Sequence, residues 1–216
     1  MKVFKLILMF VLILGESYAQ DTIPNNFAVA ATKNNYLYIG IKNPLSISVS
    51  GFSNKDLIIK TTNGILKKEK DEFIVTPISG NRLEILVYVK CKTDTCFVGT
   101  SQFRLKRIPD PEVFIAWCKG KALVSKGELL AGGGLIASVE DFVYDLEFSI
   151  KYFELKTIKD NKEIILKSSN AAYTKEMKDL MSALKPGTEL IFENIIVINP
   201  DNTEKQSEKK IVVKLL

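Results

Sequence analysis

Short segments in which apolar and polar residues alternate recur along the first half of the chain, and this pattern most constrains the fold. Leu45, Ile47 and Val49 alternate with serines, and residues 83–89 alternate in the same way. A period of two buries one face of a β-strand. Other β-prone segments lie between turn residues: FAVAAT, NYLYIGI, DLIIKTT, EFIVTPI and CFVGTSQFRLKR. A spacing of about ten residues predicts a β-sandwich, placed at residues 20–107.

A proline-rich stretch follows the last of these segments. Pro109 and Pro111 flank Asp110. Each proline fixes its own φ and favours an extended conformation in the residue before it. We therefore expect a short, stiff interdomain linker at residues 108–111 and a second domain at residues 112–216.

The second domain is predicted to be β-rich with one docked α-helix, so the fold class is mainly β with tandem Ig-like sandwich domains. Apolar residues alternate from Phe142 to Tyr152, which predicts one long half-buried strand. Acidic residues at 140, 141, 145 and 147 are then expected on a solvated strand face. The helix is expected to begin after Thr174, because apolar residues follow at helical spacing: Met177, Leu180, Met181 and Leu184. Two further strands around a polar loop are expected at the end of the chain.

Three consecutive glycines, Gly132, Gly133 and Gly134, stand between two apolar runs. A phosphate-binding loop would open a helix and carry a lysine or a further glycine at fixed spacing. Here the β-prone residues Leu-Ile-Ala-Ser-Val follow instead. We interpret the glycines as a structural turn that permits positive φ and close packing.

The first residues resemble a signal peptide. A basic start is followed by the apolar run Leu6–Leu14 and by the small residues Ser17 and Ala19. Spanning a bilayer takes about 20 apolar residues, so the run is too short to be a transmembrane helix. Residues 1–19 are therefore predicted to be a cleaved signal, an uncleaved anchor being the alternative, and the mature chain to be periplasmic or secreted.

Export makes a disulfide plausible for the cysteines. Cys91 and Cys96 close a short predicted hairpin loop and are the expected pair. Cys118 is left over. It is expected to be a buried apolar side chain, with an intermolecular disulfide as the alternative.

The chain contains no histidine. Catalytic triads with a histidine base and histidine-containing zinc sites are thereby excluded. No carboxylate, lysine or tyrosine stands at a spacing that a mechanism requires, so we expect no enzyme activity, no catalytic residues, no metal and no cofactor. The net charge of +5 is scattered along the chain, which does not indicate nucleic-acid binding.

Four stretches resemble the C-terminal periplasmic region of the gliding-motility protein GldM, also called PorM. They are YIGIKNPLSISVSG, FRLKRIPDP, ELLAGGGLIASVEDFVYDLEFSI and LKPGTELIFENIIV. In that family this region forms tandem β-sandwich domains of a dimeric periplasmic rod that contacts an outer-membrane ring of the type IX secretion system. In that family a membrane-spanning helix and a long helical segment link the rod to an inner-membrane motor. Here a cleavable signal is predicted in their place, so coupling to a motor is not expected from the resemblance.

The resemblance implies a non-enzymatic scaffold or interaction protein that binds components of type IX secretion or a second copy of itself. A different class of function is also open. Exposed aromatic residues could make a β-sandwich a secreted adhesive module for carbohydrate or protein, and Tyr36, Tyr38 and Trp117 are the candidates.

Overall fold

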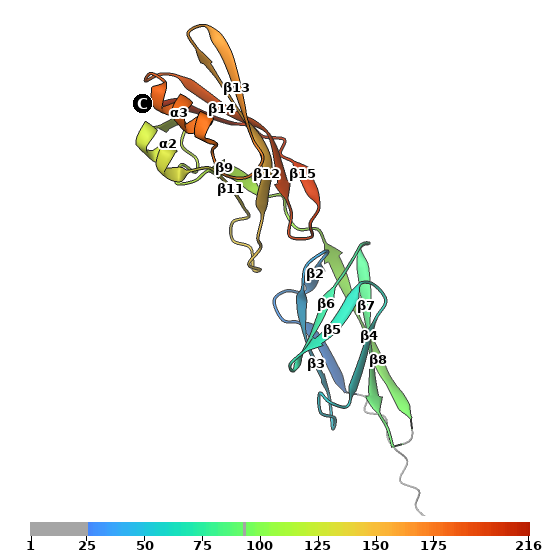
Figure 1. Ribbon diagram of the computed structural model, residues 1–216. Helices are drawn as coiled ribbons and strands as arrows, with labels where there is room; N and C mark the ends of the chain where they lie inside the picture. The colour runs from blue at the N-terminus through green and yellow to red at the C-terminus, as the bar shows by residue number, and fades with distance from the viewer. Residues whose placement is uncertain (1–25, 93) are drawn as a thin grey trace, which may run out of the picture.

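The computed structural model describes residues 26–92 and 94–216, which form two β-rich domains (Figure 1). The mainly β fold class expected from the sequence is confirmed. Each domain has its own hydrophobic core, one built from residues between Leu37 and Leu105 and the other from residues between Ile115 and Leu215. The predicted signal peptide lies outside the described residues.

The first domain is a sandwich of two four-stranded sheets. One sheet has the strand order β1 (Phe27–Ala31), β3 (Asn43–Val49), β6 (Glu72–Thr76), β5 (Ile65–Glu69). The other has the order β2 (Tyr36–Tyr38), β8 (Thr95–Lys106), β7 (Arg82–Lys90), β4 (Leu57–Thr61). The alternating residues of β3 and β7 point into the shared core, where Ile85, Val87 and Val89 are fully buried. The expected period of two therefore sets which face of each strand is buried.

Strand β5 was not expected, because its sequence Ile-Leu-Lys-Lys-Glu has no apolar alternation. It lies at the edge of its sheet and, in the part of the chain that the structure describes, pairs with β6 alone. An edge strand with one neighbour can remain largely exposed, and lysines on such a strand discourage further pairing.

The second domain has a larger sheet with the order β10 (Leu123–Val124), β16 (Ile211–Leu215), β14 (Glu189–Ile198), β12 (Ser149–Lys159), β13 (Lys162–Ser168). The short strand β15 (Glu204–Gln206) pairs with β14, and β9 (Glu112–Ile115) pairs with β11 (Leu135–Ser138). Helices α2 (Lys126–Gly132) and α3 (Lys175–Ala183) contribute to the core with Leu129, Met177 and Met181. Figure 1 shows both helices near the end of this domain that lies away from the first.

The prediction of one long strand from Phe142 to Tyr152 was wrong. Strand β12 begins at Ser149, and residues 139–148 form an irregular loop. The strand instead continues to Lys159 and turns back through β13. Tyr144 of the loop is buried and Phe142 and Leu146 are partly buried in a cluster with residues of the first domain, as described below, so their alternation reflects burial without strand pairing.

The expectation of a single helix was also incomplete. The helix after Thr174 is present as α3, and the Thr174 hydroxyl accepts the amide of Met177 at 3.3 Å. Helix α2 is a second, unexpected helix. It has only seven residues and includes two glycines, which lower helix propensity. Strand β15, in the polar loop between the last two expected strands, was missed as well.

Candidate functional site

The two domains meet through a small cluster of aromatic residues. Tyr38 and Ile41 of the first domain and Tyr144 of the second are buried together. The ring centroid of Tyr38 lies 4.7 Å from that of Phe142 and 5.6 Å from that of Tyr144. Both partner rings come from the loop 139–148. The loop is therefore the element through which the second domain packs on the first.

A buried asparagine organises the polar part of this contact. Asn43 has no exposed surface. Its side-chain oxygen accepts a hydrogen bond from the backbone amide of Tyr38 at 2.7 Å, and its side-chain nitrogen donates to the carbonyls of Tyr38 and Ile41, each at 2.8 Å. The Tyr144 hydroxyl donates to the same Asn43 oxygen at 3.2 Å. Burial raises the pKa of Tyr144, so the tyrosine stays a neutral donor.

Two further contacts cross between the domains. The Lys33 ammonium donates to the Val143 carbonyl at 2.9 Å and lies 4.6 Å from the ring centre of Tyr144, a cation–π distance. Gly40 approaches the β14–β15 turn so closely that a Cβ there would lie 2.5 Å from the Cβ of Asp201. Contacts on several sides of the joint favour one mutual orientation of the domains.

The proline segment lies beside this contact. Residues 107–111 have no regular secondary structure, and Ile108 packs at the margin of the aromatic cluster. The Asp110 carboxylate forms an ion pair with Lys205 of β15 at 2.6 Å. The segment Pro109–Asp110–Pro111 is thus attached to the second domain by a side-chain contact as well as by the chain.

The three glycines occupy positions with different requirements. A Cβ on Gly132 would lie 2.5 Å from the Ala116 carbonyl oxygen, and one on Gly134 would lie 2.1 Å from the Ala171 carbonyl oxygen. Gly133 ends α2 in the left-handed conformation with φ +71°. The backbone of this segment also forms hydrogen bonds on two sides. The Gly134 carbonyl accepts from the Ala116 amide at 3.1 Å, and the Gly133 carbonyl accepts from the Tyr173 amide at 2.9 Å. The segment therefore holds three parts of the domain together by main-chain contact.

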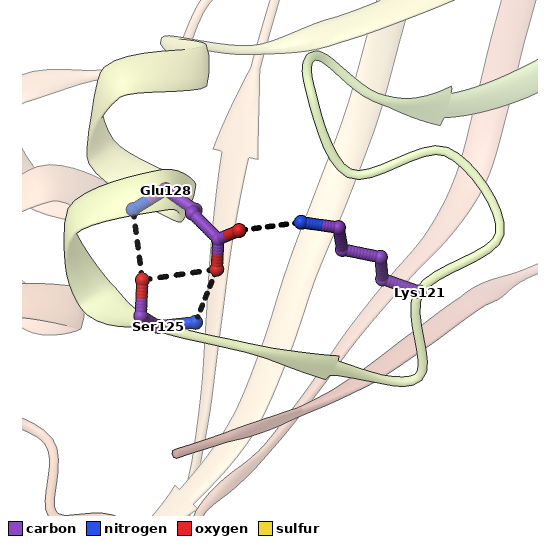
Figure 2. Close-up of polar contacts among 3 residues, drawn as sticks. All are labelled: Lys121, Ser125 and Glu128. Carbon is purple, nitrogen blue, oxygen red and sulfur yellow. Dashed lines mark hydrogen bonds and ion pairs between the residues drawn. The ribbon is translucent and has the colours of Figure 1, made fainter.

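The beginning of α2 carries a capping box, shown in Figure 2. The Ser125 hydroxyl accepts the amide of Glu128 at 3.2 Å, and the Glu128 carboxylate accepts the amide of Ser125 at 3.0 Å. The same carboxylate forms an ion pair with Lys121. These partners, with Lys121 first, lower the pKa of Glu128 from 4.5 to about 2. The pattern Ser-x-x-Glu was the sequence signal that could have located this helix.

The cysteines differ in their surroundings. Cys91 and Cys96 form a disulfide across the β7–β8 hairpin. Cys118 is a buried free thiol whose pKa is raised by burial.

The candidate aromatic residues do not form one surface. Tyr36 and Tyr38 belong to the interdomain cluster, with ring centroids 5.3 Å apart. Trp117 is 78% exposed and has a positive φ of 66°. Left-handed backbone is unusual for a bulky residue and costs roughly 1–2 kcal/mol. The corner after β9 therefore presents a lone tryptophan to solvent.

The acidic residues expected on a strand face all lie in the loop 139–148, because the strand begins only at Ser149. Glu140 forms an ion pair with Lys119 at 2.5 Å, and Lys119 also contacts Glu112 at 3.0 Å. In residues 26–92 and 94–216, no group of three or more histidine, cysteine or carboxylate side chains is arranged to hold a metal ion. Neither α2 nor α3 is long and apolar enough to cross a membrane.

A groove that the sequence did not predict lies in the second domain. Its volume is about 580 Å³, and it lies between β9 with the residues just before it and the segment from β15 to β16. Apolar residues from both sides line it: Val113, Phe114, Ile115, Val197, Ile211 and Val212. Lysines stand on the β15–β16 side at positions 205, 209 and 210. The groove is built from residues distant in sequence, so no local pattern announces it.

Comparison with known families assigns both domains. Residues 26–106 match the model of the GldM third domain, and residues 109–215 match that of the GldM C-terminal domain. Among curated proteins, no sequence matches the chain. The two matches together cover nearly all of the described residues, in the order in which the domains are named. The chain therefore belongs to the GldM family, of which it carries the third and C-terminal domains.

Proposed function

We propose that this protein is a non-enzymatic periplasmic scaffold that binds other proteins of the gliding-motility or type IX secretion apparatus. The observation that carries the proposal is the match of both domains to GldM, whose domains are structural parts of that system. The packed joint supports it. Tyr144, Asn43 and Lys33 connect the domains through side chains, which suits a part that holds partners at a defined spacing.

The partners proposed are protein components associated with the outer-membrane ring, and a second copy of this chain in a homodimer. Cleavage of residues 1–19 would release the mature protein from the inner membrane. The proposed role is that of the outer, partner-binding part of the rod.

In-cell cross-linking tests this role. The tagged chain is cross-linked in its native host, purified, and its partners are identified by mass spectrometry, while the mass of the purified chain is measured by light scattering. We expect cross-links to envelope components of type IX secretion. If the chain is a monomer and cross-links to no secretion component, the proposal is wrong.

One observation favours a second candidate, a secreted adhesive module. Trp117 is almost fully exposed in a left-handed backbone conformation, and exposed tryptophans stack on sugars and anchor protein interfaces. A glycan array probed with the wild type and with Trp117→Ala tests it. Glycan binding that the substitution abolishes would favour this role, and absence of binding by the wild type would remove it.

A further inference from the structure

The groove between β9 and β16 is bordered by two strand edges with free main-chain groups. In β16, the amide of Lys214 donates to Ala122 at 2.9 Å, whereas the amide of Leu215 donates to Thr188 on the opposite side at 2.9 Å. Main-chain groups alternate in direction along a strand. Val212 therefore directs its N–H and C=O to the same side as Lys214, away from β14 and beyond the end of β10.

Strand β9 has a free edge for the same reason. The amide of Ala116 donates to Gly134 at 3.1 Å, and Phe114 pairs with Ile136, so these residues direct their main chain toward β11. Val113 must then direct its main chain away from β11, toward the groove. Apart from the sheet ladders, the described residues form no hydrogen bond with the main chain of Val113 or Val212.

The walls of the groove determine which segment fits. The apolar lining from Val113, Ile115 and Ile211 favours a segment with apolar side chains at alternate positions. On the rim, Lys205 is paired with Asp110 and Lys121 with Glu128. Lys209 and Lys210 are exposed, and among the described residues neither ammonium group has an ion-pair partner. Three carboxylates also line the groove, and two of them are paired with lysines, Asp110 with Lys205 and Glu112 with Lys119. Among the described residues, the rim charges without an ion-pair partner are then Lys209, Lys210 and Glu208, and this small positive excess complements carboxylates.

We propose that this groove binds an extended, acidic segment of a partner protein, which adds as a strand to the free edge of β16. Main-chain hydrogen bonds to Val212 supply affinity, alternate apolar side chains enter the groove, and carboxylates face Lys209 and Lys210. The inference rests on the proposed role as a protein-binding scaffold and specifies the surface and the kind of segment bound.

The test is a titration of the isotope-labelled mature chain, followed by NMR of the backbone amides. The probe is a short peptide in which valine alternates with threonine between terminal glutamates. A peptide with lysines in place of the glutamates tests charge, and an N-methylated acidic peptide tests the main-chain bonds. We expect the acidic peptide to cause saturable shifts at Val113 and Val212, and both other peptides to bind more weakly.

Two variants separate main-chain from side-chain contributions. Val212→Pro removes the outward N–H without removing a bond to β14, and proline is tolerated at such edge positions. Val212→Ala keeps the N–H. Loss of one hydrogen bond should weaken the acidic peptide about five- to tenfold in Val212→Pro and leave its affinity nearly unchanged in Val212→Ala. Lys209→Glu with Lys210→Glu, which leaves the sheet intact, should reverse the preference between the acidic and basic peptides.

Several outcomes would overturn the proposal: no saturable shift at the groove, equal binding of the acidic and basic peptides, or equal effects of proline and alanine at Val212. Shifts at the groove that appear when the protein alone is concentrated would identify a second copy as the occupant, which also overturns it. Each of these results leaves cross-links to secretion components unaffected, so failure of the groove is distinguishable from failure of the scaffold role.

Discussion

At the scale of single residues, three neighbouring glycines are required for two different physical reasons. Gly133 has the left-handed conformation that ends α2, whereas Gly132 and Gly134 lie against carbonyl oxygens where a Cβ has no space. A turn prediction from sequence includes all three but cannot separate these reasons, because the opposing carbonyls belong to residues distant in sequence.

The glycines give a first prediction. Gly134→Ala should lower the free energy of unfolding by about 3 kcal/mol, because its Cβ would overlap the Ala171 carbonyl oxygen. Gly133→Ala is the matched control and should cost about 1 kcal/mol, since only backbone conformation opposes it. Urea unfolding measures both. Equal losses in the two variants would contradict the steric account.

The Glu128 carboxylate gives a prediction about pH. Its pKa is lowered in the folded protein to about 2 from an ordinary value of 4.5. The folded state therefore favours the ionised form, and this stabilisation is complete above pH 4.5 and is lost as the pH falls toward 2. Wild type should lose stability through this window, and Glu128→Gln should lose less. Urea unfolding at a series of pH values measures the difference between the two proteins. Parallel curves would show that the negative charge of Glu128 does not contribute to stability.

At the scale of elements, the loop 139–148 shows how far the sequence could be interpreted. The alternation of Phe142, Tyr144 and Leu146 correctly indicates one packed side, on which Tyr144 is buried and the other two are partly buried. It cannot indicate that the burying surface is the other domain instead of a neighbouring strand. Whether a segment forms a β-strand depends on its main-chain hydrogen-bond partners. A period of two is equally compatible with an extended loop that packs on one side.

Most other elements were predictable for local reasons. The strands of the first domain carry their own alternation, and α3 carries a cap and an apolar stripe. Edge strand β5 and helix α2 were missed because exposed lysines and glycines hide their local preferences. Of the candidate site, the proline segment and the glycines carry a local sequence signal, and their roles as interdomain linker and structural turn stay predictions. The roles of Asn43 and Lys33 and the groove depend on tertiary contact and carry no local signal.

The loop gives a prediction of its own. Tyr144→Phe removes the bond to Asn43 but keeps the ring, and should cost about 1 kcal/mol. Tyr144→Ala also removes the packing on Tyr38 and should cost about 3 kcal/mol. Urea unfolding of the wild type and the two variants measures both losses of free energy. If the alanine variant is as stable as the phenylalanine variant, the ring does not hold the domains together.

The disulfide of the β7–β8 hairpin gives a prediction about stability. Replacing Cys91 and Cys96 with alanine should lower the free energy of unfolding by about 2 kcal/mol, because the short loop becomes unrestricted in the unfolded chain. A reducing agent should lower wild-type stability by a similar amount and leave the double variant unchanged. The buried Cys118 serves as an internal control, since its replacement by alanine should not alter the response to reductant.

At the scale of the whole molecule, the interdomain contacts predict a narrow distribution of distances between the domains. Spin labels at Ile65 of β5 and Ile158 of β12, both exposed, report this distance by electron paramagnetic resonance. We expect a single narrow peak for the otherwise wild-type chain and a broad one in Tyr144→Ala, because the contacts at Tyr38 are lost. A broad peak in the otherwise wild-type chain would show that the prolines and the aromatic cluster do not fix the angle between the two domains.

The loop 139–148 also bears on how such a chain can change during evolution. Its Phe142 and Tyr144 side chains pack against residues of the first domain, and the buried Asn43 accepts the hydrogen bond of the Tyr144 hydroxyl. Exchange of either domain for an unrelated one would leave Phe142 and Tyr144 facing water and Asn43 without one of its partners. The two domains are thus separate in their cores but are not interchangeable modules, and recombination that preserves both must carry them as one inherited unit.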